Sequence, residues 1–181
     1  AWGHAPHHFF ITYHKASDCW LKLDIVTRVA YGNPIHNLHT PLGDNCLQHR
    51  RKLGPVYVPA PEDEFITLLL HCVLDKGYVA QHRGERLKEL SHQIGDEAYI
   101  SMLIRRYWDP GSNWPLLSAL VNTGAWDALL SQRKAVARRL AQRAPLATRL
   151  QFVRDRVLRK LQRGVGYLFP PTPSVALLAP D

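Results

Sequence analysis

Histidine and cysteine residues recur at short spacings between residues 36 and 49. His36, His39, Cys46 and His49 form the pattern H-x2-H-x6-C-x2-H. Imidazole and thiolate groups are the ligands that zinc prefers, and paired spacings of two residues are common in tetrahedral zinc sites. The alternative is a loop without a metal, because the segment is short and the chain is rich in histidine. We favour the loop.

A second candidate is His71, which lies in a long apolar segment among polar residues at helical spacing. Asp75 and Thr67 are four residues from it on either side, and Glu64 is seven residues before it. A carboxylate at this spacing could orient the imidazole toward a nucleotide pocket, which makes His71 a candidate catalytic residue. The alternative is a partly buried histidine that serves only the fold.

Three basic residues follow the histidine pattern directly. Arg50, Arg51 and Lys52 come immediately after His49. Their charges could hold a triphosphate or another acidic substrate, so we treat them as candidate nucleotide-binding residues. The alternative is a solvated loop.

The positive charge is concentrated in residues 133–163, which contain 11 Lys or Arg and one acid, Asp155, in a chain of formal net charge +8. Such helices could bind nucleic acid or an acidic partner. The residues considered for this role are Arg138, Arg139, Arg154 and Arg159. Phe152 is the one aromatic residue here for stacking on bases. Docking on an anionic membrane and a solvated helical connector are alternatives, and we favour the connector.

Composition is that of a folded globular protein, with 46% hydrophobic and 21% charged residues among 181. No apolar stretch approaches the ~20 residues needed to cross a bilayer, and the first residues do not resemble a secretory signal. Cys19, Cys46 and Cys72 occur in unrelated contexts. They argue against a disulfide framework and favour a reducing, cytoplasmic location.

The elements that must position these residues begin with strands. His8–His14 and Trp20–Thr27 are rich in β-branched and aromatic residues, so we predict a β-hairpin. Because side chains alternate along a strand, Asp24 is expected to point away from the face that carries Leu and Ile. Residues 32–45 are predicted to form a loop, and Pro55–Val58 a short third strand.

From Pro61 onward the chain is predicted to be helical. The segment 60–77 has a proline and three acids in its first turn and ends at Lys76 and Gly77, which are typical start and stop signals. Further helices are predicted at 84–94, 96–108, 115–123, 126–142 and 145–163. The last of these has an apolar stripe formed by Leu146, Leu150, Val153, Val157 and Leu161.

The sequence PSVALLAPD, Pro173–Asp181, is an aliphatic strand followed by a turn. It resembles the first strand of thymidylate-kinase-like P-loop domains, whose loop would continue with Gly, a variable residue, Gly, Lys and Ser or Thr. Pro180 and Asp181 match the beginning of that loop. An ordinary buried strand at a domain edge is the alternative.

A second resemblance covers residues 9–90. WLKLDIVT followed by VYVPAPEDEFITLLLHCVLDKG is similar to the later half of a bacterial nucleotidyltransferase-fold family that is fused to a thymidylate-kinase-like domain. In that family an apolar–Asp–apolar strand supplies the third carboxylate of a metal site, and Leu23–Asp24–Ile25 matches this element. The resemblance implies that Asp24 is a magnesium ligand and a catalytic residue. The alternative is a hairpin aspartate paired with Lys22 or Lys15.

One aspartate does not make such a metal site, because nucleotidyl transfer uses two divalent ions and each needs several oxygen ligands. The Gly-Ser turn and paired acids of the family are not among these residues. We expect them upstream, and their loss is the alternative. The 181 residues are therefore predicted to be inactive on their own.

The predicted fold class is α+β, with a small antiparallel sheet that is a remnant of a nucleotidyltransferase fold and a mostly α-helical region after it. Residues 1–95 would end a nucleotidyltransferase-like domain, 96–163 would form a helical connector with a basic face, and 164–181 would be a linker and the first strand of a P-loop kinase-like domain. The implied function is magnesium-dependent nucleotidyl or phosphoryl transfer from a nucleoside triphosphate. The alternative is a noncatalytic basic helical module that binds nucleic acid or an acidic partner.

Overall fold

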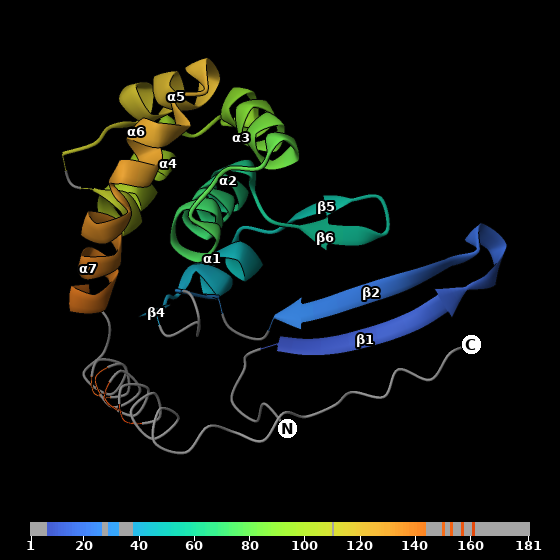
Figure 1. Cartoon of the computed structure of the whole chain (residues 1–181). Coiled ribbons are helices and arrows are strands. Elements are labelled where there is room, and N and C mark those ends of the chain that lie inside the picture. Colours follow the sequence, from blue (N-terminus) through green and yellow to red (C-terminus); the bar gives the residue numbers. More distant parts are fainter. Residues whose placement is uncertain are drawn as a thin grey trace.

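The computed structural model describes residues 7–26, 29–32, 38–109 and 111–143, together with Leu150, Val153, Val157 and Leu161. It leaves out the side chains of residues 7–9 and 23–26. These described residues form an α+β fold that is mostly helical, with three two-stranded antiparallel sheets and seven α-helices (Figure 1). The predicted fold class is confirmed at this level. None of the helices among them is long and apolar enough to cross a bilayer.

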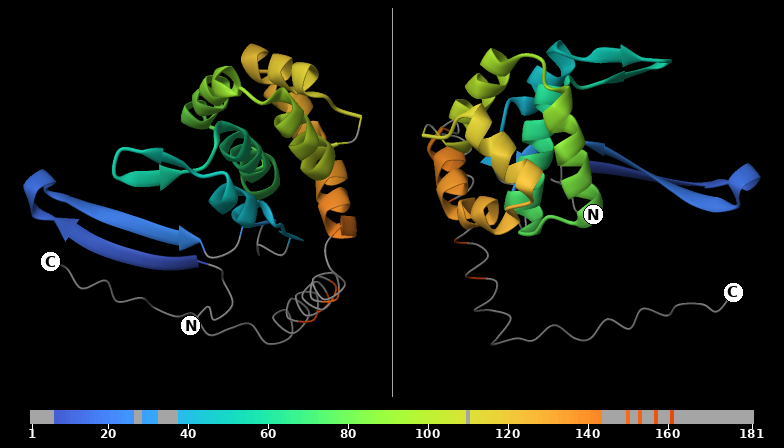
Figure 2. Two further views of the ribbon diagram at one scale, coloured as in Figure 1. Left: turned by 180° about the vertical axis from the view of Figure 1, so that it is seen from behind. Right: turned by 90° about the horizontal axis from the view of Figure 1, so that it is seen from above.

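The first sheet is a hairpin that projects from the helical body (Figures 1 and 2). Its strands β1 (His7–His14) and β2 (Cys19–Val26) are joined by the short 3-10 turn η1 (Lys15–Ser17) and pair along their full length. The predicted hairpin is therefore confirmed. Asp24 lies opposite Phe9, two residues before β2 ends beside the helices. The direction predicted for the Asp24 side chain lies outside the described residues.

Side chains at the tip hold the turn of the hairpin. Tyr13 and Trp20 lie directly opposite each other, and their ring centroids are 5.3 Å apart. Such cross-strand aromatic pairs stabilise an antiparallel pair of strands. The Tyr13 hydroxyl also donates to Asp18, which adopts a left-handed conformation with φ of 46°. Asp tolerates this conformation better than most residues, which suits it to a tight turn.

Two smaller sheets and a helix follow. β3 (Ala30–Tyr31) pairs with β4 (Leu38–His39), and β5 (Arg51–Leu53) pairs with β6 (Val56–Val58). Between the sheets lies α1 (Leu42–Gln48), whose Leu42 side chain is fully buried. The prediction of a loop over residues 32–45 is therefore wrong where β4 and the start of α1 fall. The many polar residues of this segment predicted a loop, but its apolar residues Leu38 and Leu42 are buried in the core.

The centre of the body is one continuous helix. α2 (Pro61–Leu70) runs directly into the π-helical turn η2 (His71–Lys76), and the helix ends at Gly77 with φ of 72°. A left-handed residue after the last turn favours glycine because a Cβ would be strained there. The helix predicted over 60–77 is thus confirmed at both ends.

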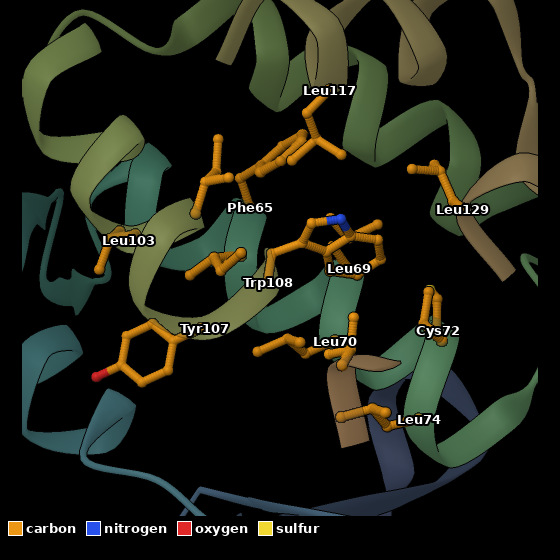
Figure 3. Packing of buried hydrophobic residues seen from close by; sticks show 14 of the residues in the cluster. Phe65, Leu69, Leu70, Cys72, Leu74, Leu103, Tyr107, Trp108, Leu117 and Leu129 are labelled. Carbon is orange, nitrogen blue, oxygen red and sulfur yellow. The ribbon is translucent and has the colours of Figure 1, made fainter. Parts of the chain in front are cut away.

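The central helix is enclosed by other elements. α2 contacts α1, α3 (Gln81–Gln93), α4 (Glu97–Leu103) and the π-helical η3 (Ile104–Trp108), and η2 contacts β3 and α7 (Arg133–Arg143). Apolar side chains therefore emerge on several sides of the helix and meet Trp108, Leu103, Tyr107, Leu117 and Leu129 from its neighbours (Figure 3). The fully buried apolar residues of the central helix are Phe65, Ile66, Leu69, Leu70, Cys72 and Val73.

The helices predicted between residues 84 and 142 are confirmed with two changes. α3 begins three residues earlier than Gly84, which lies inside the helix. A Cβ on Gly84 would come within 2.9 Å of the Trp126 ring, so this glycine permits a close approach. The helix predicted over 126–142 is instead two helices, α6 (Trp126–Ser131) and α7, separated at Gln132. No Gly or Pro marks this break in the sequence.

The other predicted helices agree closely. The Asn113 side chain accepts from the backbone N–H of Leu116 and starts α5 (Trp114–Thr123), and Asp96 accepts from Tyr99 at the start of α4. Most of the helix predicted over 145–163, and the strand predicted at the C-terminus, lie outside the described residues. Four residues of the predicted apolar stripe are helical and between 50% and 70% exposed, namely Leu150, Val153, Val157 and Leu161.

The central helix gives a stability prediction. We expect Leu69→Ala to lower the free energy of unfolding by about 2–5 kcal/mol, because a fully buried leucine loses its contacts and leaves a cavity. Leu116→Ala is the matched control on the surface of α5, where 52% of the residue is exposed, and a change within about 0.5 kcal/mol is expected. Urea unfolding followed by circular dichroism measures both. Equal losses in the two variants would contradict the central position of α2.

Candidate functional site

The three acids at the start of α2 are bonded to three different parts of the chain. Oε1 of Glu62 accepts the backbone N–H groups of Gly95 and Asp96, both at 3.1 Å. The two carboxylate oxygens of Glu64 accept from Arg86 of α3 at 2.8 and 2.9 Å. Asp63, between them, is fully buried. The acids at the helix start are therefore stabilised by the helix dipole and also by hydrogen bonds to distant parts of the chain.

Asp63 is the centre of a hydrogen-bonded triangle. Its Oδ1 accepts from the Tyr99 hydroxyl at 2.8 Å, and its Oδ2 lies 3.2 Å from Nδ1 of His49. The Tyr99 oxygen is also 2.7 Å from Nδ1 of His49. One assignment of protons satisfies all three contacts: the Tyr99 hydroxyl donates to Asp63, and the Nδ1–H of His49 donates to both oxygens. In this tautomer Nε2 of His49 keeps its lone pair.

The titration behaviour of this triangle follows from burial. Burial raises the pKa of the Asp63 carboxyl, while the bonds from Tyr99 and the nearby His49 act in the opposite direction. Burial, followed by the hydrogen bond to Asp63, raises the pKa of Tyr99 far above its usual range. Tyr99 therefore remains a hydrogen-bond donor at any pH at which the protein would be studied.

A second aspartate–histidine pair occupies the other end of the same helix. Nδ1 of His71 lies 2.8 Å from Oδ2 of Asp75, and Oδ1 of Asp75 accepts the backbone N–H of Gly32 at 2.6 Å. The contact expected from the four-residue spacing is present. His71 begins the π-helical turn η2, a conformation that is frequent at functional sites.

The two pairs belong to one line of polar residues, which we call the polar stripe: Asp63, Thr67, His71 and Asp75. These residues recur every four positions on an otherwise apolar helix and so share one side of it. The backbone carbonyl of Thr67 accepts from the Tyr31 hydroxyl of β3 at 3.3 Å. Glu64, the residue seven positions before His71, bonds to Arg86 on α3.

His71 of the polar stripe and His49, which bonds to Asp63 of the stripe, are partly exposed to solvent. The side chains of His49 and His71 are 44% and 34% exposed, whereas Asp63 and Asp75 are buried. Eight residues separate Asp63 from His71, which is about 12 Å along a helix axis. Each ring is held through Nδ1 by a buried carboxylate, so each can offer Nε2 as a base, a nucleophile or a phosphate ligand.

The three predicted nucleotide-binding residues lie next to one of these histidines. Arg50 donates to the Leu47 carbonyl at 2.5 Å and stacks over the Tyr57 ring at 5.3 Å. Arg51 and Lys52 are exposed on β5. The segment therefore places cations directly after His49, at the N-terminal end of α2.

Some basic residues of helix α7 bond to backbone carbonyls, and others are exposed on the surface. Arg133, Arg139 and Arg143 donate to the backbone carbonyls of Leu74, Arg105 and Arg106, which lie in the turns η2 and η3. Carbonyls in the last turn of a helix lack partners within it, so these arginines satisfy them.

Other cations on this side of the protein are exposed. They are Lys134, Arg138, Arg105 and Arg106. Within the described part of the chain, no carboxylate lies at salt-bridge distance from any of the four. Arg154 and Arg159, the other residues predicted to contact an acidic partner, lie outside the described residues.

Metal ligands do not gather in the described part of the chain. No group of three or more His, Cys, Asp or Glu residues there could hold a metal ion. For the zinc alternative, His36 lies outside the described residues, and Nδ1 of His49 is bonded to Asp63 and Tyr99. The carboxylates of Asp63 and Asp75 accept hydrogen bonds from side chains and backbone, and the Asp24 side chain lies outside the described residues.

Comparisons of the chain with protein-family models, with curated proteins and with solved structures find no match. The argument for function therefore comes from the side chains themselves.

Sequence reasoning missed Asp63, Tyr99 and the role of His49 in orienting them. Tyr99 lies 50 residues from His49 and 36 from Asp63 in the chain, so no local pattern joins the three. A signal was available for part of the set. Polar residues repeated every four positions through an apolar helix mark one side of it, and this spacing singles out Asp63 and Thr67 as well as His71.

The buried triangle gives a prediction with a pH dependence. Tyr99→Phe removes a donor from the buried Asp63 carboxylate, so we expect the free energy of unfolding to fall by about 1–3 kcal/mol at pH 7. Tyr78→Phe is the matched control, since Tyr78 is 55% exposed. Urea unfolding at pH 7 and at pH 4 measures the effect.

The sign follows from the raised pKa of Asp63. The native state binds more protons than the unfolded state from the unfolded pKa of about 3.9 up to the native value, so stability falls as pH rises through this window. Removing Tyr99 as a donor raises the native pKa further. The loss in Tyr99→Phe should therefore be larger at pH 7 than at pH 4, and the reverse order would refute the triangle.

Proposed function

We propose that the protein binds a nucleoside triphosphate and takes part in nucleotidyl or phosphoryl transfer. His71 of the polar stripe and the segment His49–Lys52 are the groups that would contact the phosphates. The observation that carries the proposal is the pair of half-exposed histidines, each held through Nδ1 by a buried carboxylate, one of them followed directly by three cations.

The chemistry of these groups fits a polyphosphate. A histidine whose Nδ1–H is bonded to a carboxylate has a fixed ring orientation, and its Nε2 can accept a proton or, when protonated, donate to a phosphate oxygen. Arg51 and Lys52 add positive charge without a carboxylate partner at salt-bridge distance among the described residues. Hydrogen bonds between charged groups are worth about 1.5–3 kcal/mol each.

We include magnesium in the proposal because the strand that contains Asp24 resembles a metal-binding strand of the nucleotidyltransferase-fold family. Asp24 lies near the end of β2 that meets the helical body. A single carboxylate holds a divalent ion weakly, since magnesium usually keeps several waters and takes further ligands from carboxylates and substrate phosphates. We therefore assign Asp24 a supporting contact with a metal–nucleotide complex and derive no reaction step from it.

The first test is the affinity for ATP, GTP, CTP and UTP, measured by isothermal titration calorimetry. We expect His71→Gln and the double variant Arg51→Ala/Lys52→Ala each to weaken binding about tenfold or more, which corresponds to about 1.4 kcal/mol. His92→Gln and the pair Lys134→Ala/Arg138→Ala are matched controls, because these residues are exposed elsewhere on the surface. Absence of binding to all four nucleotides, or equal losses in the controls, would reject the proposal.

A companion measurement addresses Asp24. Magnesium should strengthen triphosphate binding by the unaltered chain, and Asp24→Asn should remove most of that gain while leaving metal-free binding unchanged. If magnesium still strengthens binding in Asp24→Asn, the metal role of Asp24 is wrong. The phosphate contacts are then judged by the first test alone.

A second candidate function rests on the exposed cations around α7. Lys134, Arg138, Arg105 and Arg106 have no carboxylate at salt-bridge distance among the described residues, which favours a polyanionic partner such as nucleic acid. Against it, three other arginines of α7 are engaged by backbone carbonyls. The chain would then act as a noncatalytic binding module.

Salt dependence tests this second function. With a labelled single-stranded or duplex oligonucleotide and fluorescence anisotropy, log K should fall linearly with log salt concentration, because binding releases counterions. Lys134→Ala/Arg138→Ala should reduce the magnitude of that slope by about 0.7–0.9 for each phosphate contact that is lost. Arg51→Ala/Lys52→Ala serves as the control pair. Binding that is weak and independent of salt would eliminate the nucleic-acid function.

A further inference from the structure

The hairpin β1–β2 exposes apolar side chains on both of its faces. Phe10 and Leu21 share one face and are 56% and 46% exposed, while Ile11 and Trp20 share the other and are 68% and 72% exposed. Among the described residues the two strands pair only with each other, and the hairpin projects from the body (Figure 2). A two-stranded hairpin is at best marginally stable in water without further packing.

The two edges of the hairpin differ in how they are protected. β2 carries Lys22 and Asp24, and charged residues discourage pairing with another strand. β1 is His7–His14, HHFFITYH, which contains no Lys, Arg, Asp, Glu or Pro. Its pairing with β2 advances residue by residue without a bulge. β1 is therefore the edge at which a further strand can add.

We propose that β1 pairs with β1 of a second copy of this chain, antiparallel and about a two-fold axis at Ile11. The two hairpins then form one four-stranded sheet in the order β2–β1–β1–β2. Because the axis passes through Ile11, the numbers of two residues that lie opposite each other add up to about 22, twice the number of the axis residue. Phe10 lies opposite Thr12 of the second copy, and Ile11 lies opposite Ile11.

The sequence of β1 suits this symmetric register. Read outward from Ile11, the first pair, Phe10 and Thr12, differs in type, and the next two pairs match: position 9 (Phe) falls opposite Tyr13, and position 8 (His) falls opposite His14. No charged residue is brought against another of the same sign. Residues directly opposite in an antiparallel pair have Cβ atoms about 4.5–5.5 Å apart, so the central isoleucines are within contact distance.

The same register extends packing that already exists within one hairpin. Tyr13 packs on Trp20 with ring centroids 5.3 Å apart. The register places position 9 of the second copy, a phenylalanine in the sequence, opposite Tyr13, so an aromatic residue type follows Tyr13 and Trp20 across the strands. A two-fold interface uses the same surface twice, which requires the self-complementary pattern that β1 has.

A different occupant of the β1 edge would not require this symmetry. A strand of another protein, or another segment of a longer chain, needs only to complement β1, and no near-palindrome around Ile11 would be expected. The second copy is therefore the partner that the sequence of β1 favours. This inference concerns assembly and does not depend on the proposed function.

The experiment is a charge exchange at the two-fold axis, followed by light scattering coupled to size exclusion. The unaltered chain should have twice the monomer mass of 20.6 kDa. Ile11→Lys and Ile11→Glu should each fall to the monomer mass, since like charges would lie opposite each other. An equal mixture of the two variants should regain the dimer mass, because unlike charges then meet at the axis.

Controls separate loss of pairing from loss of folding. Leu47→Lys places the same charge on α1, where 62% of the residue is exposed, and should leave the dimer intact. Circular dichroism and urea unfolding should show an unchanged helical body in every variant. A monomeric unaltered chain at all concentrations, a dimer that survives Ile11→Lys, or a mixture that stays monomeric would each overturn the proposal.

Discussion

The fold depends on burial of an acidic helix start inside the protein. Glu62, Asp63 and Glu64 are consecutive on α2, so they point in three directions around the helix axis. They bind, in turn, the backbone before α4, the side chains of Tyr99 and His49, and Arg86 of α3. Each carboxylate would be costly to bury without a partner. These bonds therefore favour enclosure of the apolar residues that follow by α1, α3 and α4.

The C-terminal end of the same helix is contacted by a positively charged arginine side chain. Arg133 donates to the Leu74 carbonyl in η2, and Arg139 and Arg143 do the same for carbonyls in η3. π-helical turns leave carbonyls that the regular ladder does not satisfy, and the long guanidinium side chains of α7 reach them. Part of the strong basic charge of residues 133–143 is thus explained by the fold, and only the remaining exposed cations are available to a ligand.

The polar stripe and the hairpin are two different surfaces of one chain. Two buried carboxylates of the polar stripe, Asp63 and Asp75, bond to Nδ1 of the partly exposed His49 and His71, an arrangement suited to small anionic ligands. In the hairpin, exposed aromatic and aliphatic residues lie on an uncharged edge, which is suited to pairing between strands. The two surfaces are separate, since the hairpin projects from the helical body while the polar stripe lies along its central helix.

The sequence by itself determined the elements with strong local signals. Pro61 and Gly77 predicted the ends of the central helix, and the β-branched and aromatic residues of 8–14 and 20–27 predicted the hairpin, because both signals depend on neighbours in the chain. Only the tertiary structure decided that Asp63 joins His49 and Tyr99, that residues 42–48 form a helix, and that α6 and α7 are separate. These features depend on contacts between distant residues, and burial against such neighbours can override local composition and propensity.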